Sequence, residues 1–174
     1  MNKQLTAKIK GDEAGMLGFS KGNKGTLLAV CDGEVFGVEN VPDEVFSQKI
    51  LGDGFAQKPE NGTIRAPGEG VIAEVAESKH AYCIEGADGA QILVHIGIDT
   101  VQLKGEGFEP KVKKGDKVRA GAVIAEADLE LIKNKGYDSS VITLITNTEK
   151  AKSIRAETGA AQGGVSVALR YKIS

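Results

Sequence analysis

The sequence HAYCIEGADGAQILVHIGIDTV, residues 80–101, contains two apolar runs separated by a polar break with two glycines. The runs AYCI and QILV have the composition of strands, and EGADGA has that of a tight turn, so the stretch is typical of a β-hairpin. Both histidines of the chain, His80 and His95, lie within it. The hairpin therefore predicts that the two imidazole rings lie close together.

The length of the hairpin loop decides how the two histidines face one another. If a two-residue loop is centred on Ala87 and Asp88, His80 lies directly opposite His95, with the two Cβ atoms about 4.5–5.5 Å apart. A three-residue loop shifts the pairing by one residue and places Ile96 opposite His80. We take the two-residue loop as the first expectation and leave the three-residue loop open.

The rest of the chain also has the composition of short strands and turns. The 174 residues include 23 glycines, and only 5% are aromatic. The segment AVCDGEVFGV, residues 29–38, resembles APGEGVIAEV, residues 66–75, which indicates an internal duplication. We therefore predict a mainly β fold, an antiparallel β-sandwich or barrel with duplicated hairpin units, of the barrel-sandwich hybrid type.

Two or three short helices are expected between the strands. A single helical turn begins between residues 40 and 43, and a second helix, LELIKNK, follows a capping aspartate at Asp128. A third helix, TEKAKSIRAE, is predicted after Asn147.

Composition and charge exclude several classes of function. The net charge is −2, with lysine and glutamate interspersed, whereas nucleic-acid binding needs a clustered basic face. No apolar run approaches the roughly 18 residues that span a bilayer, and the N-terminus has no apolar core of a secretory signal. We therefore expect a cytoplasmic protein. An amphipathic helix on a membrane surface is the alternative for the first 25 residues.

Two neighbouring histidines favour a shared chemical task. Imidazole titrates near neutrality, so one ring nitrogen can act as a nucleophile while a hydrogen bond fixes the other. At Gly97 the backbone can bring a carbonyl group to the ring of His95, and Asp99 can orient one ring through its carboxylate. The trio His80, His95 and Asp99 can also form a three-ligand zinc site, so a zinc hydrolase is one alternative. Ordinary core packing of the two rings is another.

Residues 89–101, GAQILVHIGIDTV, resemble the active-site signature of the glucose-type enzyme IIA component of the bacterial phosphoenolpyruvate:sugar phosphotransferase system. Other blocks similar to this family are VPDEVFSQKILGDGFAQKP, IRAPGEGVI, ESKHAY, LKGEGF and KKGDKVRAG. The resemblance covers residues 26–174, which we take as the enzyme IIA phosphocarrier domain. It leaves residues 1–25 as a loosely ordered N-terminal arm. It also implies an antiparallel β fold with duplicated hairpins.

The resemblance implies roles for individual residues. His95 is the phosphoacceptor, His80 stabilises the phosphoryl group without accepting it, and Ser78 supplies a hydroxyl where the family commonly has threonine. Gly97 and Asp99 complete the expected catalytic site. The phosphoryl group passes from the phosphohistidine of the carrier HPr to Nε2 of His95, and then to a cysteine of a sugar-specific enzyme IIB. The family implies no metal, nucleotide or other cofactor.

A relay protein must dock two partners in turn on one face, and the family does this with an apolar ring around the histidines. The matching positions are Val45, Phe46, Ile50, Leu51, Leu93 and Ile96. Asp43 and Asp99 add carboxylates that can meet basic side chains of HPr. Core packing is the alternative for each apolar position. We expect a monomer that reaches the membrane only through its permease, and regulatory proteins that read its phosphorylation state as further partners.

Overall fold

The computed structural model describes residues 23–174, which contain fourteen strands, two α-helices and two short 3₁₀ helices. The N-terminal arm that we predicted lies outside the described residues as far as position 22. Its last three residues, 23–25, belong to the first strand. None of the helices in the described part is long and apolar enough to cross a membrane.

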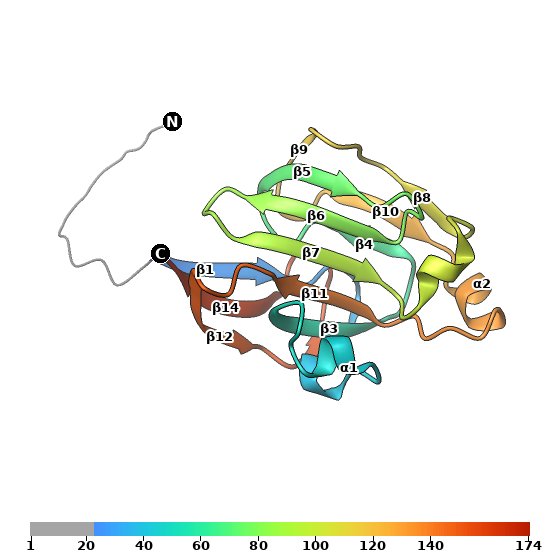
Figure 1. Ribbon diagram of the computed structural model, residues 1–174, viewed down its shortest axis with the longest axis horizontal. Helices are drawn as coiled ribbons and strands as arrows, with labels where there is room; N and C mark the ends of the chain where they lie inside the picture. Colours follow the sequence, from blue (N-terminus) through green and yellow to red (C-terminus); the bar gives the residue numbers. More distant parts are fainter. Residues whose placement is uncertain (1–22) are drawn as a thin grey trace.

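The largest sheet has eight strands in the order β13-β2-β3-β11-β7-β6-β5-β9, all paired antiparallel. Figure 1 shows its middle strands β3, β11, β7, β6 and β5 side by side. The strands are β2 (Gly33–Gly37), β3 (Asp53–Pro59), β5 (Gly70–Val75), β6 (Ala81–Gly86), β7 (Gln91–Ile96), β9 (Lys117–Val118), β11 (Val141–Ile145) and β13 (Gly159–Ala161).

Two three-stranded sheets, β1-β14-β12 and β4-β10-β8, complete the fold. The main hydrophobic core draws buried side chains from all three sheets, among them Leu27, Ile64 and Val94. This arrangement confirms the predicted mainly β, antiparallel sandwich. The strands of the smaller sheets are β1 (Asn23–Leu28), β4 (Thr63–Arg65), β8 (Phe108–Pro110), β10 (Val123–Ala127), β12 (Ala151–Ala156) and β14 (Val167–Ile173).

The strand order repeats one arrangement twice, as the similarity of residues 29–38 and 66–75 predicts. The hairpins β2–β3 and β5–β6 occupy equivalent places on either side of the central pair β11–β7, and the two small sheets correspond strand by strand. The two copies meet where the Arg65 N–H donates to the Val30 carbonyl (2.7 Å) and the Leu28 N–H donates to the Pro67 carbonyl (2.8 Å). The topology therefore confirms the internal duplication.

The loop of the β6–β7 hairpin has three residues, 87–89. The Gly89 N–H donates to the Gly86 carbonyl (3.0 Å), and the Gly86 N–H donates to the Ala90 carbonyl (2.8 Å). Gly89 adopts a φ of 96°, in the left-handed region that glycine favours. A tight turn followed by a left-handed residue is a common solution for a three-residue loop.

This loop sets the position of the two histidines. Ala81 pairs with His95, and the Ile96 N–H donates to the main-chain carbonyl of His80 (2.7 Å). Our first expectation, in which His80 lies directly opposite His95, is therefore wrong, and the three-residue alternative is correct. The two-residue loop fails because the left-handed turn falls at Gly89, one residue later than a loop centred on positions 87 and 88 requires.

Two of the three predicted helices are present. The helix α1 (Glu44–Ser47) begins after Asp43, whose carboxylate accepts from the Val45 N–H (2.9 Å). The helix α2 (Leu129–Asn134) begins after Asp128, whose carboxylate accepts from the Leu131 N–H (3.0 Å). Both aspartates are N-caps, whose carboxylates accept hydrogen bonds from N–H groups of the first turn that have no partner within the helix. The 3₁₀ helices are η2 (Val38–Asn40) and η3 (Thr100–Leu103).

The third predicted helix is wrong, because residues 151–156 form strand β12 and pair with β14. Sheet pairing with a distant segment overrides the weak helix preference of this stretch. Asn147, expected to cap that helix, instead ties down the β6–β7 hairpin. Its side-chain oxygen accepts from the Gln91 N–H (2.8 Å), and its amide donates to the Gly89 carbonyl (3.0 Å).

A second, smaller core lies on the other face of the eight-stranded sheet. Here Val38, Val41 and Phe46, from the connection between β2 and β3, pack on Ile142 and Leu144 of β11. All five residues of β11 are buried, because one of its faces contacts the main core and the other contacts this connection. The second core holds α1 beside strand β7, close to His95.

Candidate functional site

His95 projects from the outer face of the eight-stranded sheet, near the end of β7. Strand alternation buries Val94 and Ile96 in the main core and directs the side chain of His95 to the opposite face. Its cross-strand neighbour on β11, Ile142, is fully buried under the β2–β3 connection, whereas His95 is only partly buried. The ring therefore lies at the border between a packed core and solvent.

A hydrogen bond to the backbone decides which nitrogen of His95 carries the proton. Nδ1 lies 2.8 Å from the Gly97 carbonyl oxygen. Because a carbonyl oxygen can only accept, Nδ1 must be the donor, and the lone pair of the neutral ring is then on Nε2. Gly97 adopts a φ of 82°, and a Cβ at this position would overlap the side chain of Thr100. Glycine is thus required for the backbone to turn its carbonyl towards the ring.

The ring of His80 contacts the ring of His95 edge to face. Their centroids are 4.9 Å apart, and their planes are inclined by 86°. His80 is only 8% exposed and lies just before β6, in the turn from β5, where Lys79 has a φ of 64°. Nδ1 of His80 is buried and makes no hydrogen bond of normal geometry to any residue of the described part. The predicted proximity of the two histidines is therefore confirmed, but it results from the turn between β5 and β6 and not from direct pairing across the β6–β7 hairpin.

A third ring, that of Phe46, contacts His95 from α1. The centroids of Phe46 and His95 are 5.0 Å apart, with the planes inclined by 61°, and Phe46 is buried. The two duplicated hairpins differ at this point. The β2–β3 connection contains α1 and Phe46, whereas the equivalent β5–β6 connection is the short turn that carries His80. The site is therefore formed where the two copies of the repeat are unlike.

The surroundings keep both histidines neutral at pH 7. Burial and, less strongly, the neighbouring His80 lower the pKa of His95 to about 4, against the opposing effects of the Gly97 carbonyl and the charges of Asp43 and Asp99. Burial also lowers the pKa of His80, an effect that the main chain of Ser78 opposes in part. A neutral His95 has a free lone pair on Nε2, as a nucleophile needs.

The lowered pKa of His95 predicts a loss of stability in mild acid. In the unfolded chain its pKa is near 6.5, so between pH 6.5 and about 4 the unfolded state binds more protons than the folded state. Stability is thus full above pH 6.5 and falls as the pH drops through this window, by about 2 kcal/mol at pH 4.5. Urea unfolding at pH 7.5 and 4.5 measures this loss.

His95→Gln, which does not titrate, is the matched variant for that measurement. Its stability should fall less between the two pH values than that of the parent chain, by about the same 2 kcal/mol. An equal loss in both proteins would show that His95 is not the group responsible.

The other two predicted site residues, Asp99 and Ser78, make no hydrogen bond to the ring of His95 within the described residues. Asp99 is exposed, and within residues 23–174 it makes no hydrogen bond to either histidine, since the orienting bond to His95 comes from Gly97. Ser78 lies partly buried in the β5–β6 turn, two residues before His80. Across the described residues, no group of three metal-binding side chains is close enough to hold an ion. The three-ligand zinc site considered from the sequence is therefore not formed.

The predicted apolar ring divides into exposed and buried members. Val45 (43% exposed), Ile50 (64%) and Leu51 (43%) are open to solvent in or just after α1, and we refer to these three residues as the exposed apolar set. Leu93 is partly buried on the same face of the sheet as His95. Phe46 is buried against His95. Ile96 is fully buried in the main core, so its assignment to a docking ring is wrong, because strand alternation points it away from His95.

One exposed apolar side chain was missed from the sequence. Val101 is the last residue of the signature that contains His95; it lies in η3 and is 46% exposed. The sequence gives no periodic pattern in this short 3₁₀ turn from which its exposure could be predicted.

Comparison with known proteins places the chain in a family. Residues 25–151 match the family model described as phosphoenolpyruvate-dependent sugar phosphotransferase system, EIIA 1. The chain is 40% identical over 151 residues to the PTS system glucose-specific EIIA component of Buchnera aphidicola subsp. Acyrthosiphon pisum, covering 87% of this chain and 94% of that protein. It is 42% identical over 143 residues to the PTS system glucose-specific EIICBA component of Streptococcus pneumoniae, covering 82% of this chain and 20% of that longer protein.

A solved structure gives the same result. The glucose permease IIA from Mycoplasma capricolum superimposes with a TM-score of 0.76 at 34% sequence identity, covering 85% of this chain and 96% of that one. At this identity both the fold and the sequence point to the same family.

Proposed function

The chain belongs to the EIIA 1 family of the phosphoenolpyruvate-dependent sugar phosphotransferase system, and we propose that Nε2 of His95 is the atom that carries its phosphoryl group. As a glucose-type EIIA component, the chain is a phosphotransferase that relays a phosphoryl group from HPr to enzyme IIB in sugar uptake. The observation that supports this assignment is the hydrogen bond from Nδ1 of His95 to the Gly97 carbonyl, because it leaves Nε2 unprotonated.

The first transfer begins with the lone pair on Nε2. Nε2 attacks the phosphorus of the HPr phosphohistidine in line, so the new Nε2–P bond forms as the P–N bond to HPr breaks and its electron pair returns to the HPr ring. Nδ1 keeps its proton throughout. The phosphorylated ring gains positive charge, which the Gly97 carbonyl, Asp43 and Asp99 favour, since all three raise the pKa of His95. In the second transfer, a cysteine thiolate of enzyme IIB attacks the phosphorus, so the S–P bond forms as the Nε2–P bond breaks and its electron pair returns to Nε2 of His95.

His80 is placed to stabilise the transferring group. It is a buried neutral ring in contact with His95, and a ring N–H in such a position can donate a hydrogen bond to a phosphoryl oxygen. A donor that is fixed before the reaction stabilises the charge on the equatorial oxygens without reorganisation. Ser78, on the same turn, provides a second donor, its hydroxyl, in this proposal.

The exposed apolar set is the proposed docking surface for HPr and enzyme IIB. It lies in or just after α1, whose Phe46 contacts His95, so a partner seated on it reaches the reacting nitrogen. Solvent-exposed apolar side chains that cluster in this way are characteristic of interaction surfaces. The same surface would present the phosphorylation state to regulatory proteins. We place this monomeric carrier in the cytoplasm, where the free thiols of Cys31 and Cys83 stay reduced.

Phosphorylation of the full chain tests the proposal. After incubation with phosphoenolpyruvate, enzyme I and HPr, we expect one phosphate per chain, labile in acid and stable in alkali, as a phosphoramidate is. Phosphorus NMR and peptide mapping should place it on Nε2 of His95. A sample without HPr should stay unlabelled. A folded chain that acquires no acid-labile phosphate, or acquires it elsewhere than on His95, would contradict the assignment.

A further inference from the structure

The outer face of the small sheet β1-β14-β12 carries cations directly opposite one another. On this face Lys172 of β14 pairs with Lys24 of β1 on one side and with Lys152 of β12 on the other. Two residues along β14, Arg170 pairs with Arg155 of β12. Like charges directly across a strand pair destabilise a sheet, so this arrangement has a cost that an uncharged face would not have.

A cavity lies within this face. Its volume is about 530 Å³, and its lining includes Lys24, Arg155, Arg170 and Lys172, with no carboxylate among the lining residues of the described part. A β-bulge in β12 between Lys152 and Arg155 interrupts the pairing with β14, and Ser153 in the bulge has a φ of 55°. Bulges bend a strand and redirect its side chains. Here the bulge interrupts the β12–β14 pairing beside the cationic residues.

Only part of this positive charge is neutralised by neighbouring side chains. Glu157 pairs with Arg170 (3.1 Å) and Arg155 (3.7 Å). Within residues 23–174, none of the three lysines Lys24, Lys152 and Lys172 forms an ion pair. The face therefore has an excess of positive charge in a chain whose net charge is −2.

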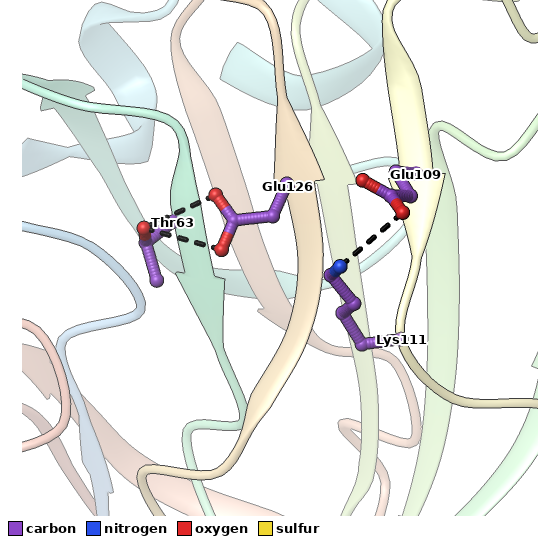
Figure 2. A network of polar contacts seen from close by, with 4 residues as sticks. All are labelled: Thr63, Glu109, Lys111 and Glu126. Carbon is purple, nitrogen blue, oxygen red and sulfur yellow. Dashed lines mark hydrogen bonds and ion pairs between the residues drawn. The ribbon is translucent and has the colours of Figure 1, made fainter.

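The duplicated sheet β4-β10-β8 shows that the scaffold itself does not require these cations. At the places equivalent to Arg170 and Arg155 it has Glu126 and Glu109, paired across strands in the same way. Figure 2 shows the local partners of these acidic side chains: the Thr63 hydroxyl donates to the Glu126 carboxylate (3.2 Å), and Lys111 forms an ion pair with Glu109 (3.3 Å). The opposite charge on the two copies is a property of the sequence and not of the fold.

We propose that the cavity on the sheet β1-β14-β12 binds a phosphate-bearing anion. Arginine presents a planar fork of donors and lysine a point charge, and together they are the usual ligands of phosphate oxygens. Binding of such an anion would offset the repulsion between the paired lysines. The site is separate from His95, which lies on the outer face of the eight-stranded sheet, so it is independent of the phosphoryl relay. The phosphate can belong to a small soluble molecule or to a lipid headgroup.

Inorganic pyrophosphate is the first probe, used with the full chain at low ionic strength. We expect it to raise the melting temperature of the parent chain and to shift the amide NMR signals of Lys24, Arg155, Arg170 and Lys172. Lys172→Gln should weaken pyrophosphate binding at least tenfold. Without the anion this variant should melt no lower than the parent, because it removes a like-charge contact.

The control variant is Lys111→Gln, which removes one positive charge beside the duplicated sheet and should bind pyrophosphate like the parent. Vesicles of phosphatidylglycerol and of phosphatidylcholine form the second arm. Sedimentation with phosphatidylglycerol vesicles alone, lost in Lys172→Gln but not in Lys111→Gln, would identify a lipid headgroup as the source of the phosphate. The proposal is overturned if neither probe binds, or if Lys172→Gln and Lys111→Gln bind both probes equally well.

Discussion

His95→Gln should abolish phosphorylation of the chain, lowering the rate of phosphate incorporation from phospho-HPr by at least about a thousandfold. Glutamine has a similar length and keeps a polar end, but its amide has no basic lone pair on nitrogen and cannot replace Nε2 as the nucleophile. His80 should not substitute, because its ring is only 8% exposed and is therefore poorly accessible to the donor. The measurement is the acid-labile phosphate formed with phosphoenolpyruvate, enzyme I and HPr.

The variant must be shown to be folded. Its circular dichroism and melting temperature at pH 7.5 should remain close to those of the parent, since the side chain is only partly buried at the border of the core and makes one hydrogen bond, to Gly97. Phosphate found on the folded His95→Gln variant would transfer the role of acceptor to another residue, and His80 would be the first to be examined.

His80→Gln should separate acceptance of the phosphoryl group from its delivery. Nε2 of His95 remains available, so the variant should still be phosphorylated by phospho-HPr. Delivery to enzyme IIB should slow by about a hundredfold, because the flexible glutamine amide does not hold its N–H in the fixed position of the imidazole donor. Rapid-quench measurements of the two half-reactions, each started from purified phosphorylated protein, give the two rates directly.

The pH profile of delivery provides a readout that simple damage to the fold would not change. In the parent, the phosphoryl group on His95 brings negative charge next to His80 and favours its protonated form, so the delivery rate should depend on pH through the protonation of His80. His80→Gln should lose this dependence. If delivery by the variant stays within about twofold of the parent, or if both half-reactions slow equally, the stabilising role assigned to His80 is wrong.

Local signals in the sequence were sufficient for several elements of the structure. Asp43 and Asp128 begin helices because an aspartate side chain can cap the N–H groups that follow it, and this depends only on neighbouring residues. The fold class followed from glycine-rich turns and from the repeat at residues 29–38 and 66–75. The proximity of Gly97 to the His95 ring was also predictable, since the two positions are only two residues apart.

Features that depend on distant parts of the chain were not predictable in the same way. Residues 151–156 form a strand because β14 lies beside them, and nothing in their own sequence identifies that partner. The hairpin register depended on whether Asp88 or Gly89 takes the left-handed conformation, which the composition of the turn leaves open. The contact between His80 and His95 arises from the turn at Lys79, so the correct pair of residues was predicted from an incorrect geometry.

Ile96 illustrates a different limit. The family resemblance assigned it to a docking ring, but strand alternation next to His95 already required it to face the opposite side of the sheet. The structure follows the alternation. In a strand, the residue next to a reacting side chain points to the opposite face of the sheet, so its closeness in sequence does not place it at the site.

The position of β1 affects how the chain folds during synthesis. β1 is an edge strand whose partner is β14, with Asn23 opposite Ile173, so the first described strand pairs with the last. While the chain is being translated, β1 has no strand to join until residues 167–173 have left the ribosome. Pairing across such a sequence separation raises the contact order and slows folding. The three-stranded sheet that carries the facing lysines therefore cannot form until residues 167–173 are available to join β1 and β12.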